Sequence, residues 1–310
     1  MATSRLLSLR DAGADAWNVY ADELLASPRS DDRERGELIR LQLELERAEG
    51  AQRATLQTRE RELIARTPSL GGPDAVLARL DATWRRGFIS RVQRPNWEGL
   101  RILLSHPSGA LVDEFILNNP QLQLDDQVEL IARSKPPLRA LQIDSDDSGT
   151  RFEGIIECGP ALQLPTLERA SIVVRQLDIE TRPPLVSPVR ELTLGAPLIP
   201  WAPLDAATFP NLTRLDLLAI VGITWQRRGF STNDQIPAPP VGPGPRFRSG
   251  GVTPKLEQLV LRNFFIDGTT MAMALELCAS TPLRELDVRG CQFATGIENE
   301  LPKLKCRVQL

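Results

Sequence analysis

Side chains able to do chemistry are sparse in this sequence of 310 residues. Its one histidine, His106 in SHPSG, has no carboxylate or thiol at a spacing that would make it a general base. The acidic run DSDDSG, residues 144–149, matches the start of a calcium loop, but Ile155 stands where such a loop needs a bidentate carboxylate. No GxxxxGK or GxGxxG sequence is present to bind phosphate. The sequence therefore predicts a protein that is not an enzyme, with no metal, cofactor or small-molecule substrate.

One enzymatic alternative stays open, an active site carried on loops around His106 and residues 144–147. Such a site requires an acid, a base and a nucleophile that converge. The sequence shows no such set, so the elements that could position side chains for binding become the main question.

The charges are balanced, with 37 basic and 40 acidic residues and a formal net charge of -3. No global field favours nucleic acid or an anionic membrane surface. No run of about 18 apolar residues occurs, and the first residues lack the apolar core of an export signal. Cys158, Cys278, Cys291 and Cys306 form no CxxC pair, which is typical of reduced thiols. We expect a cytoplasmic protein that binds neither nucleic acid nor membrane.

The first 84 residues are predicted to form a helical cap. A first helix has Asp15 as its expected N-cap and ends before Pro28. The polar sequence SPRSDDRERG, residues 27–36, is expected to connect it to a second helix in RGELIRLQLEL, whose apolar stripe is wider than a coiled-coil seam. A third helix, QRATLQTRERELIAR at residues 52–66, stops before Pro68.

Residues 85–310 repeat a short apolar template, LxxLxL. Successive copies are separated by 23, 26, 29, 22, 23, 44 and 27 residues, and all but the 44 lie in or near the period of leucine-rich repeats. The predicted fold is therefore α/β, a leucine-rich-repeat-like solenoid with a curved parallel sheet and an N-terminal helical cap. The second apolar sites of the copies are Val92, Phe115, Leu141, Ala170, Leu192, Leu215, Leu259 and Leu286.

The long spacing coincides with IPAPPVGPGPRFRSGG, in which proline and glycine disfavour both helix and strand. We expect an inserted loop at about residues 227–253. The most regular copy, LRELDVRGCQF, places Cys291 where this class of repeat uses Asn or Cys to satisfy backbone groups at the turn.

Four sequence blocks stand in order before the repeats: VYADELL, RGELIRLQLEL, RERELI and WRRGFISRV. Over roughly residues 10–95 this order resembles a bacterial repeat-companion domain, a segment that precedes leucine-rich-like repeats in large-genome bacteria. The chain departs from the family in having Glu23 where a Trp is usual, and in a longer connection before RGE. The resemblance implies association with a repeat array and brings no catalytic residues with it.

Strand residues between the template leucines should point outward onto one shared face, because successive side chains of a strand alternate. The predicted face carries interspersed charges, which favour recognition of another protein. We expect a non-enzymatic binding module or scaffold; the alternative is a regulatory or inhibitory subunit that sequesters a bacterial signalling or defence effector. The predicted partner-binding residues are Arg91, Glu114, Arg169, Glu191, Arg214, Asp216, Arg262, Glu285, Asp287 and Arg289.

Overall fold

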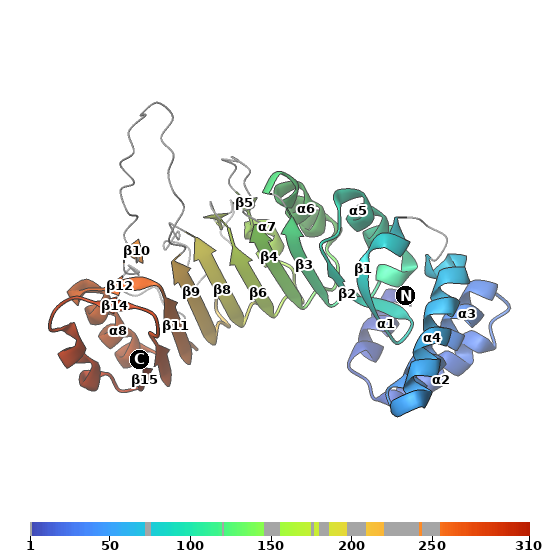
Figure 1. Ribbon diagram of the computed structural model, residues 1–310, viewed down its shortest axis with the longest axis horizontal. Helices are drawn as coiled ribbons and strands as arrows, with labels where there is room; N and C mark the ends of the chain where they lie inside the picture. The colour runs from blue at the N-terminus through green and yellow to red at the C-terminus, as the bar shows by residue number, and fades with distance from the viewer. Residues whose placement is uncertain are drawn as a thin grey trace. The chain divides into compact units, whose positions relative to one another are not determined.

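The computed structural model describes residues 2–71, 76–119, 121–145, 156–174, 177–179, 186–196, 209–219, 242–243 and 255–310. The fold is α/β, with a long and mostly parallel sheet (Figure 1). The chain divides into two compact units, unit 1 (Met1–Asn119 and Glu129–Leu141) and unit 2 (Pro120–Val128 and Gln142–Leu310). The expected loop at 227–253 lies outside the described residues apart from Gly242 and Pro243, as do residues 146–149 of DSDDSG.

Unit 1 begins with four helices and continues into the first strands of the sheet. The helices are α1 (Ala2–Arg10), α2 (Ala14–Leu25), α3 (Ser30–Leu45) and α4 (Gly50–Arg66), followed by the 3-10 turns η1 (Pro68–Leu70) and η2 (Leu77–Arg79). Next come β1 (Asp81–Arg85), β2 (Phe88–Gln93), α5 (Trp97–Ser105), η3 (Pro107–Gly109) and β3 (Glu114–Asn119). The chain passes from one unit to the other within α6 (Gln121–Ser134) and again within β4 (Ala140–Ser145).

The three segments predicted to be helical are helices, but the predicted starts of two of them are wrong. Asp15 is not the N-cap of α2; Gly13 takes that place with an extended backbone, and Asp15 lies in the first turn, where its charge favours the helix N-terminus. The segment expected to connect α2 and α3 is wrong as well, because α3 already begins at Ser30. Asp31 and Asp32 occupy that first turn, so residues that look like a polar linker stabilise a helix start. Helix α1 was not expected from the sequence.

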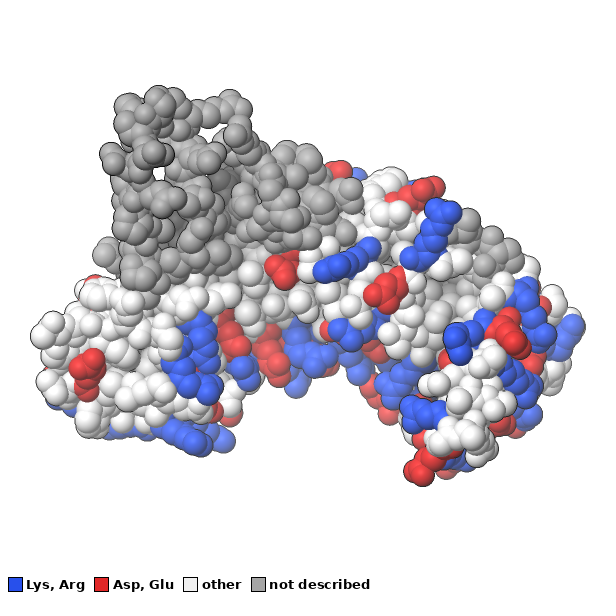
Figure 2. Space-filling model, in the orientation of Figure 1, with Lys and Arg blue, Asp and Glu red and all other residues white. Residues whose placement is uncertain are grey.

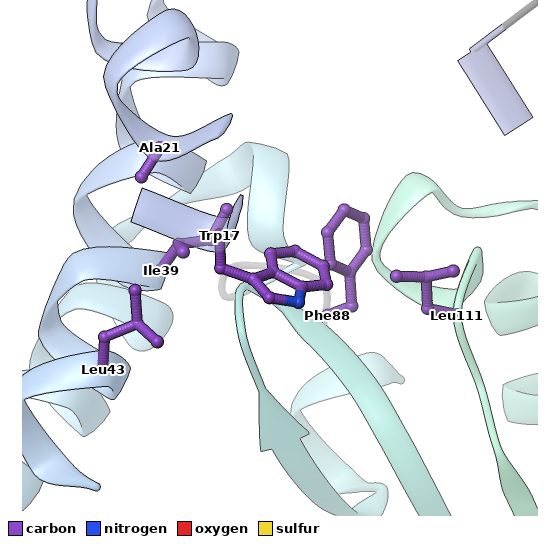
Figure 3. Close-up of a cluster of buried hydrophobic side chains, with 6 residues drawn as sticks. All are labelled: Trp17, Ala21, Ile39, Leu43, Phe88 and Leu111. Atoms are coloured by element: carbon purple, nitrogen blue, oxygen red, sulfur yellow. The ribbon is translucent and has the colours of Figure 1, made fainter. Parts of the chain in front are cut away.

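Helix α3 packs on two sides, which explains its wide apolar stripe. Its close approach to α2 requires Gly36, since a Cβ there would lie 2.9 Å from the carbonyl oxygen of Ala21. Figure 3 shows one of the resulting clusters, in which the indole of Trp17 lies next to Phe88 of β2. The cluster between α2, α3 and β2 contains Trp17, Ala21, Ile39, Leu43, Phe88 and Leu111, and that between α3 and α4 contains Leu38, Leu41, Leu63 and Leu70.

Strands β1 and β2 form an antiparallel hairpin whose two-residue turn is Arg86–Gly87. Both residues have positive φ, 50° and 78°, which is typical of a type I′ turn. Arg86 is held there by a hydrogen bond from Nη1 to the carbonyl of Ala12 at 2.9 Å and by stacking over the Trp17 ring. A Cβ at position 87 would lie 2.7 Å from Cγ1 of Ile39, so the turn can rest on α3 only with glycine.

A buried polar group, the Arg35 network, connects α3 to this hairpin. The guanidinium of Arg35 donates to the carbonyls of Gly87 at 2.5 Å and Ser69 at 3.2 Å, and to Oγ of Ser108 at 3.3 Å. It also lies 4.7 Å from the centre of the Phe88 ring. Gln42, two turns further on the same face, accepts from the backbone N–H of Gly87 at 2.6 Å. The blocks RGELIRLQLEL and WRRGFISRV therefore meet through backbone groups.

Unit 2 contains the remaining strands of the main sheet in the order β6-β8-β9-β11-β13-β15, which lie side by side in Figure 1. These strands are β6 (Arg169–Val173), β8 (Glu191–Ala196), β9 (Arg214–Ala219), β11 (Gln258–Arg262), β13 (Glu285–Asp287) and β15 (Arg307–Gln309). The other elements are β5 (Ile156–Glu157), α7 (Gly159–Leu162), β7 (Leu177–Asp178), β10 (Gly242–Pro243), β12 (Phe264–Ile266), α8 (Gly268–Ser280), β14 (Gln292–Phe293) and η4 (Ile297–Lys303).

The register of these parallel strands confirms the phase of the repeat template. The second apolar sites pair directly: Ala170 with Leu192, Leu192 with Leu215, Leu215 with Leu259 and Leu259 with Leu286. In unit 1, Val92 pairs with Phe115 in the same way. Leu215 and Leu259 are 44 positions apart in sequence, yet they are register partners on neighbouring strands. The long interval between them therefore does not disturb the strand pairing.

Backbone groups at the turns after the strands are satisfied by side chains. The thiol of Cys291 donates to the carbonyl of Leu261 at 3.4 Å, as expected for its position in the repeat. In the preceding repeat a similar contact comes from Asn263, which donates from Nδ2 to the carbonyl of Ala219 at 3.3 Å. This contact is displaced along the repeat: Asn263 comes one residue before Phe264, which the template aligns with Cys291, and Ala219 comes two residues after Leu217, the register partner of Leu261.

Candidate functional site

The outward side chains of unit 2 form an ordered row at the start of the strands. Strands β6, β8 and β9 share a burial pattern in which the first residue is exposed and the second is buried. Parallel pairing aligns these first residues across the sheet, and neighbouring strands place them about 4.8 Å apart. The row, which we call the charged row, consists of Arg169, Glu191, Arg214, Gln258, Glu285 and Arg307 in register.

The sign of the charge alternates along much of this row. Figure 2 shows blue and red side chains next to one another along the surface where β6, β8 and β9 begin in Figure 1. Glu191 stands between Arg169 and Arg214, and all three residues are exposed. The next outward-facing residues on β6, β8 and β9 are Ser171, Thr193 and Asp216, of which only Asp216 is charged. On these strands the face therefore consists of the charged row and a second row of polar residues that includes one carboxylate.

Arg214 and Glu285 are held by neighbours on the face itself. Nε and Nη2 of Arg214 each donate to the Asp216 carboxylate at 2.9 Å, and this hydrogen bonding raises the pKa of Arg214. Glu285 accepts from the amides of Gln258, at 3.4 Å, and Gln309. These side chains are thus oriented before any partner arrives, which reduces the entropy lost on binding.

Asp287 occupies the centre of a second arrangement, the Asp287 clamp, formed with Arg262 and Arg289. Arg262 donates from Nη1 and Nη2 to the two carboxylate oxygens at 2.7 and 2.5 Å, and Arg289 does so from Nε and Nη2 at 3.0 and 2.7 Å. Asp287 is only 5% exposed, so it positions two arginines and offers little surface to a partner. The sequence places it correctly on the face and does not predict its burial.

The clamp is unsuited to acid–base chemistry. Hydrogen bonds from Arg262 and then from Arg289 hold the pKa of Asp287 well below its ordinary value. Its lone pairs are already occupied, so a proton acceptor is not free at neutral pH. Within the described ranges no group of three or more His, Cys, Asp or Glu side chains is arranged to hold a metal ion. The chemistry that the face offers is charge-assisted hydrogen bonding.

Replacing Asp287 with Asn should lower the free energy of unfolding by about 2 kcal/mol at pH 7, because charge-assisted hydrogen bonds to both arginines are weakened. Since the pKa of Asp287 is depressed in the folded state, its stabilising contribution is complete above the unfolded pKa of about 4 and is lost as the pH falls below it. Urea titrations between pH 7 and pH 3 should show a steeper loss in the wild type than in Asp287→Asn.

Asp216→Asn is the matched control for that titration. Asp216 also binds an arginine, yet it is more exposed, and its replacement should cost no more than about 1 kcal/mol. Equal pH dependence in the wild type and in Asp287→Asn would contradict the role given to the clamp.

Arg91 and Glu114 of the predicted face belong to unit 1. They are register partners on β2 and β3, and Nε of Arg91 lies 3.1 Å from Oε2 of Glu114. They therefore form one partly exposed ion pair, and such a pair contributes little to stability.

The sequence reasoning missed two members of the charged row, Gln258 and Arg307. Arg307 lies on β15, whose Val308 pairs with Leu286. The signal was present, since KCRVQL repeats the template with Lys305 at the first apolar site and a spacing of 22 residues from Leu286 to Val308. A single charged substitution at the first site concealed the strand.

The groups considered for catalysis lie on different elements. His106 ends α5 and caps η3, where its Nδ1 accepts from the backbone N–H of Ser108 at 3.1 Å. Asp144 lies on β4, and the acids that follow it lie outside the described residues. His106 thus has a turn-capping contact.

Comparisons with known proteins do not assign this chain to a family. No family model matches the chain. No curated protein matches it either. A crystal structure of a Bacteroides fragilis protein, a structural-genomics target, is similar with a TM-score of 0.37 and 13% identity, over 68% of each chain. In the part of the chain that the structure describes, no helix is long and apolar enough to cross a membrane.

Proposed function

We propose that this chain is a non-enzymatic protein-binding module that docks a partner on the strand face of unit 2. The observation that carries the proposal is the charged row, in which opposite charges from neighbouring strands are fixed in register. Interspersed charges of this kind select a partner with the complementary pattern and accelerate its association. The four cysteines without a paired spacing favour a reducing, cytoplasmic setting.

The finer architecture that we propose is a leucine-rich-repeat-like solenoid with a helical cap. It is supported by template residues that pair in register at spacings of 22 to 27 residues on either side of the long interval. The cap is supported by the packing of α2 and α3 on the β1–β2 hairpin, because a terminal repeat would otherwise expose its apolar edge. In such an array the strand face is the surface that neighbouring repeats build together.

Charge reversal of the row tests the proposal. The variant Arg169→Glu with Arg214→Glu should capture its partners from an extract of the source organism at least ~10-fold less efficiently than the wild type, because each change sets like charge against the partner's acids. Arg262 is unsuitable for this experiment: its reversal would leave the buried Asp287 beside a second carboxylate.

Lys303→Glu with Lys305→Glu is the matched control, since it changes net charge equally at exposed positions outside the strands. The control should retain the partners that the row variant loses. Equal capture by the row variant and the wild type, with circular dichroism unchanged, would remove the strand face as the docking surface.

A further inference from the structure

Two of the four cysteines meet in unit 2. Cys278 lies in the last turn of α8, and Cys306 directly precedes β15. The thiol of Cys278 donates to Sγ of Cys306 at a sulfur–sulfur distance of 3.3 Å. Both side chains are half-buried, so the pair is partly accessible from solvent.

Regular structure holds each cysteine in place. Helix α8 is anchored through Leu277, which is buried, and its end is closed by Thr281, whose N–H and Oγ1 both donate to the carbonyl of Leu277. On the other side, Arg307 donates from its backbone N–H to the carbonyl of Arg284 at 2.8 Å, and β15 pairs with β13. The proximity of the sulfurs therefore follows from two packed elements and not from a loose terminus.

The remaining thiols are in different situations. Cys158 is fully buried, and the Cys291 thiol is bonded to the Leu261 carbonyl. A disulfide has a sulfur–sulfur length of about 2.05 Å, so Cys278 and Cys306 need to approach by only about 1.3 Å. Small rotations of two side chains can supply this movement.

We propose that Cys278 and Cys306 form a reversible disulfide by exchange with low-molecular-weight disulfides of the glutathione type. The Cys306 thiolate attacks one sulfur of the oxidant, giving a mixed disulfide and releasing one thiol. Cys278 then loses its proton to solvent and attacks Sγ of Cys306, and the second oxidant thiol leaves. Two protein thiols are oxidised to one disulfide, and one small disulfide is reduced to two thiols.

The electrostatics of Cys278 favour Cys306 as the first nucleophile. Burial, followed by the contact with Cys306, raises the pKa of Cys278 to about 12, so this thiol carries little thiolate at neutral pH. Cys278 is consequently a poor first nucleophile and acts as the resolving thiol. Its reaction with the mixed disulfide is intramolecular, so closeness to Cys306 compensates for the small thiolate fraction.

The bond would close a loop that spans 28 positions in sequence and contains β13 and β14. Closing such a loop restricts the unfolded chain and stabilises the folded one. It would also anchor β15, which places Arg307 in the charged row. Oxidation therefore stabilises the last strand of the face.

The test treats the purified full chain with oxidised glutathione, alkylates it under denaturing conditions with iodoacetamide, and measures its intact mass. The oxidised wild type should take up two fewer carbamidomethyl groups than the reduced protein, and peptide mapping should link Cys278 to Cys306. Its thermal midpoint should rise by several degrees and return after dithiothreitol. Retention of all four free thiols by the folded protein, or a link through Cys291, would overturn the proposal.

Four variants test the separate steps. Cys278→Ser should stop at a glutathione adduct on Cys306, whereas Cys306→Ser should react slowly and form no internal bond. Cys158→Ser with Cys291→Ser should behave as the wild type. If Cys278→Ser with Cys306→Ser shows the same thermal shift on oxidation, the stabilisation comes from elsewhere and the proposal is wrong.

Discussion

Arg35→Ala should lower the free energy of unfolding by about 4 kcal/mol, a loss far larger than that of any exposed arginine in the helices of unit 1. Arg35 is 8% exposed, and its guanidinium donates to three acceptors. Burial lowers the pKa of Arg35 to about 10, so the group still carries its charge at neutral pH. Removing one partner of such a buried polar network leaves the others unsatisfied, which is the costly case.

Urea denaturation followed by tryptophan fluorescence measures this effect, and Arg40→Ala on the same helix is the control. Arg40 is exposed and pairs with Asp22 at the surface, so its loss should cost less than about 1 kcal/mol. Arg35→Lys should fall between the two, because a single ammonium cannot reproduce the planar fork. Similar stabilities for Arg35→Ala and Arg40→Ala would show that the hairpin does not depend on the Arg35 network.

Trp17→Ala should cost about 4 kcal/mol, whereas Trp17→Phe should cost less than about 1.5 kcal/mol. Trp17 is 2% exposed and packs edge-on against Phe88, with ring centres 6.3 Å apart (Figure 3). Its indole N–H is buried and has no acceptor among the described residues. Phenylalanine would retain most of the contacts and remove an unsatisfied donor, so the two substitutions should differ strongly.

Thermal unfolding of the two variants beside the wild type gives the comparison. A large loss for Trp17→Phe as well would mean that the indole N–H is in fact bonded in solution, through water or a backbone carbonyl. A small loss for Trp17→Ala would show that α2 contributes little to the folding of unit 1.

Period-two alternation and apolar spacing were sufficient to place most strands of the main sheet, since burial of one sheet face is imposed at every second residue, but they missed β1 and β15. The register of Leu192, Leu215 and Leu259 follows directly from the template. Helix starts were harder to predict, because the sequence from Ser27 to Asp32 is compatible both with a polar linker and with the charged first turn of a helix. The local sequence does not distinguish these two possibilities, and the packing of α3 on α2 selects the helix.

Periodicity in the sequence could not predict contacts between residues that are far apart along the chain. Arg35 and Gly87 are 52 positions apart, and the hydrogen bond between them depends on how α3 meets a turn with two positive φ angles. Likewise, the burial of Asp287 depends on two arginines that the pattern places on the same face but cannot orient. The resemblance of the four blocks marked Arg35 and Gly87 as structural without showing that they touch.

The direct pairing of Leu215 with Leu259 has an evolutionary consequence. Loop-closure entropy grows only logarithmically with length, so each doubling of the connection between β9 and β11 costs about 0.6 kcal/mol. Sequence can therefore be gained or lost in this connection while both strands keep their neighbours. The position is a natural acceptor for an inserted module, and a gene fusion there could give the chain a new capability without redesigning its core.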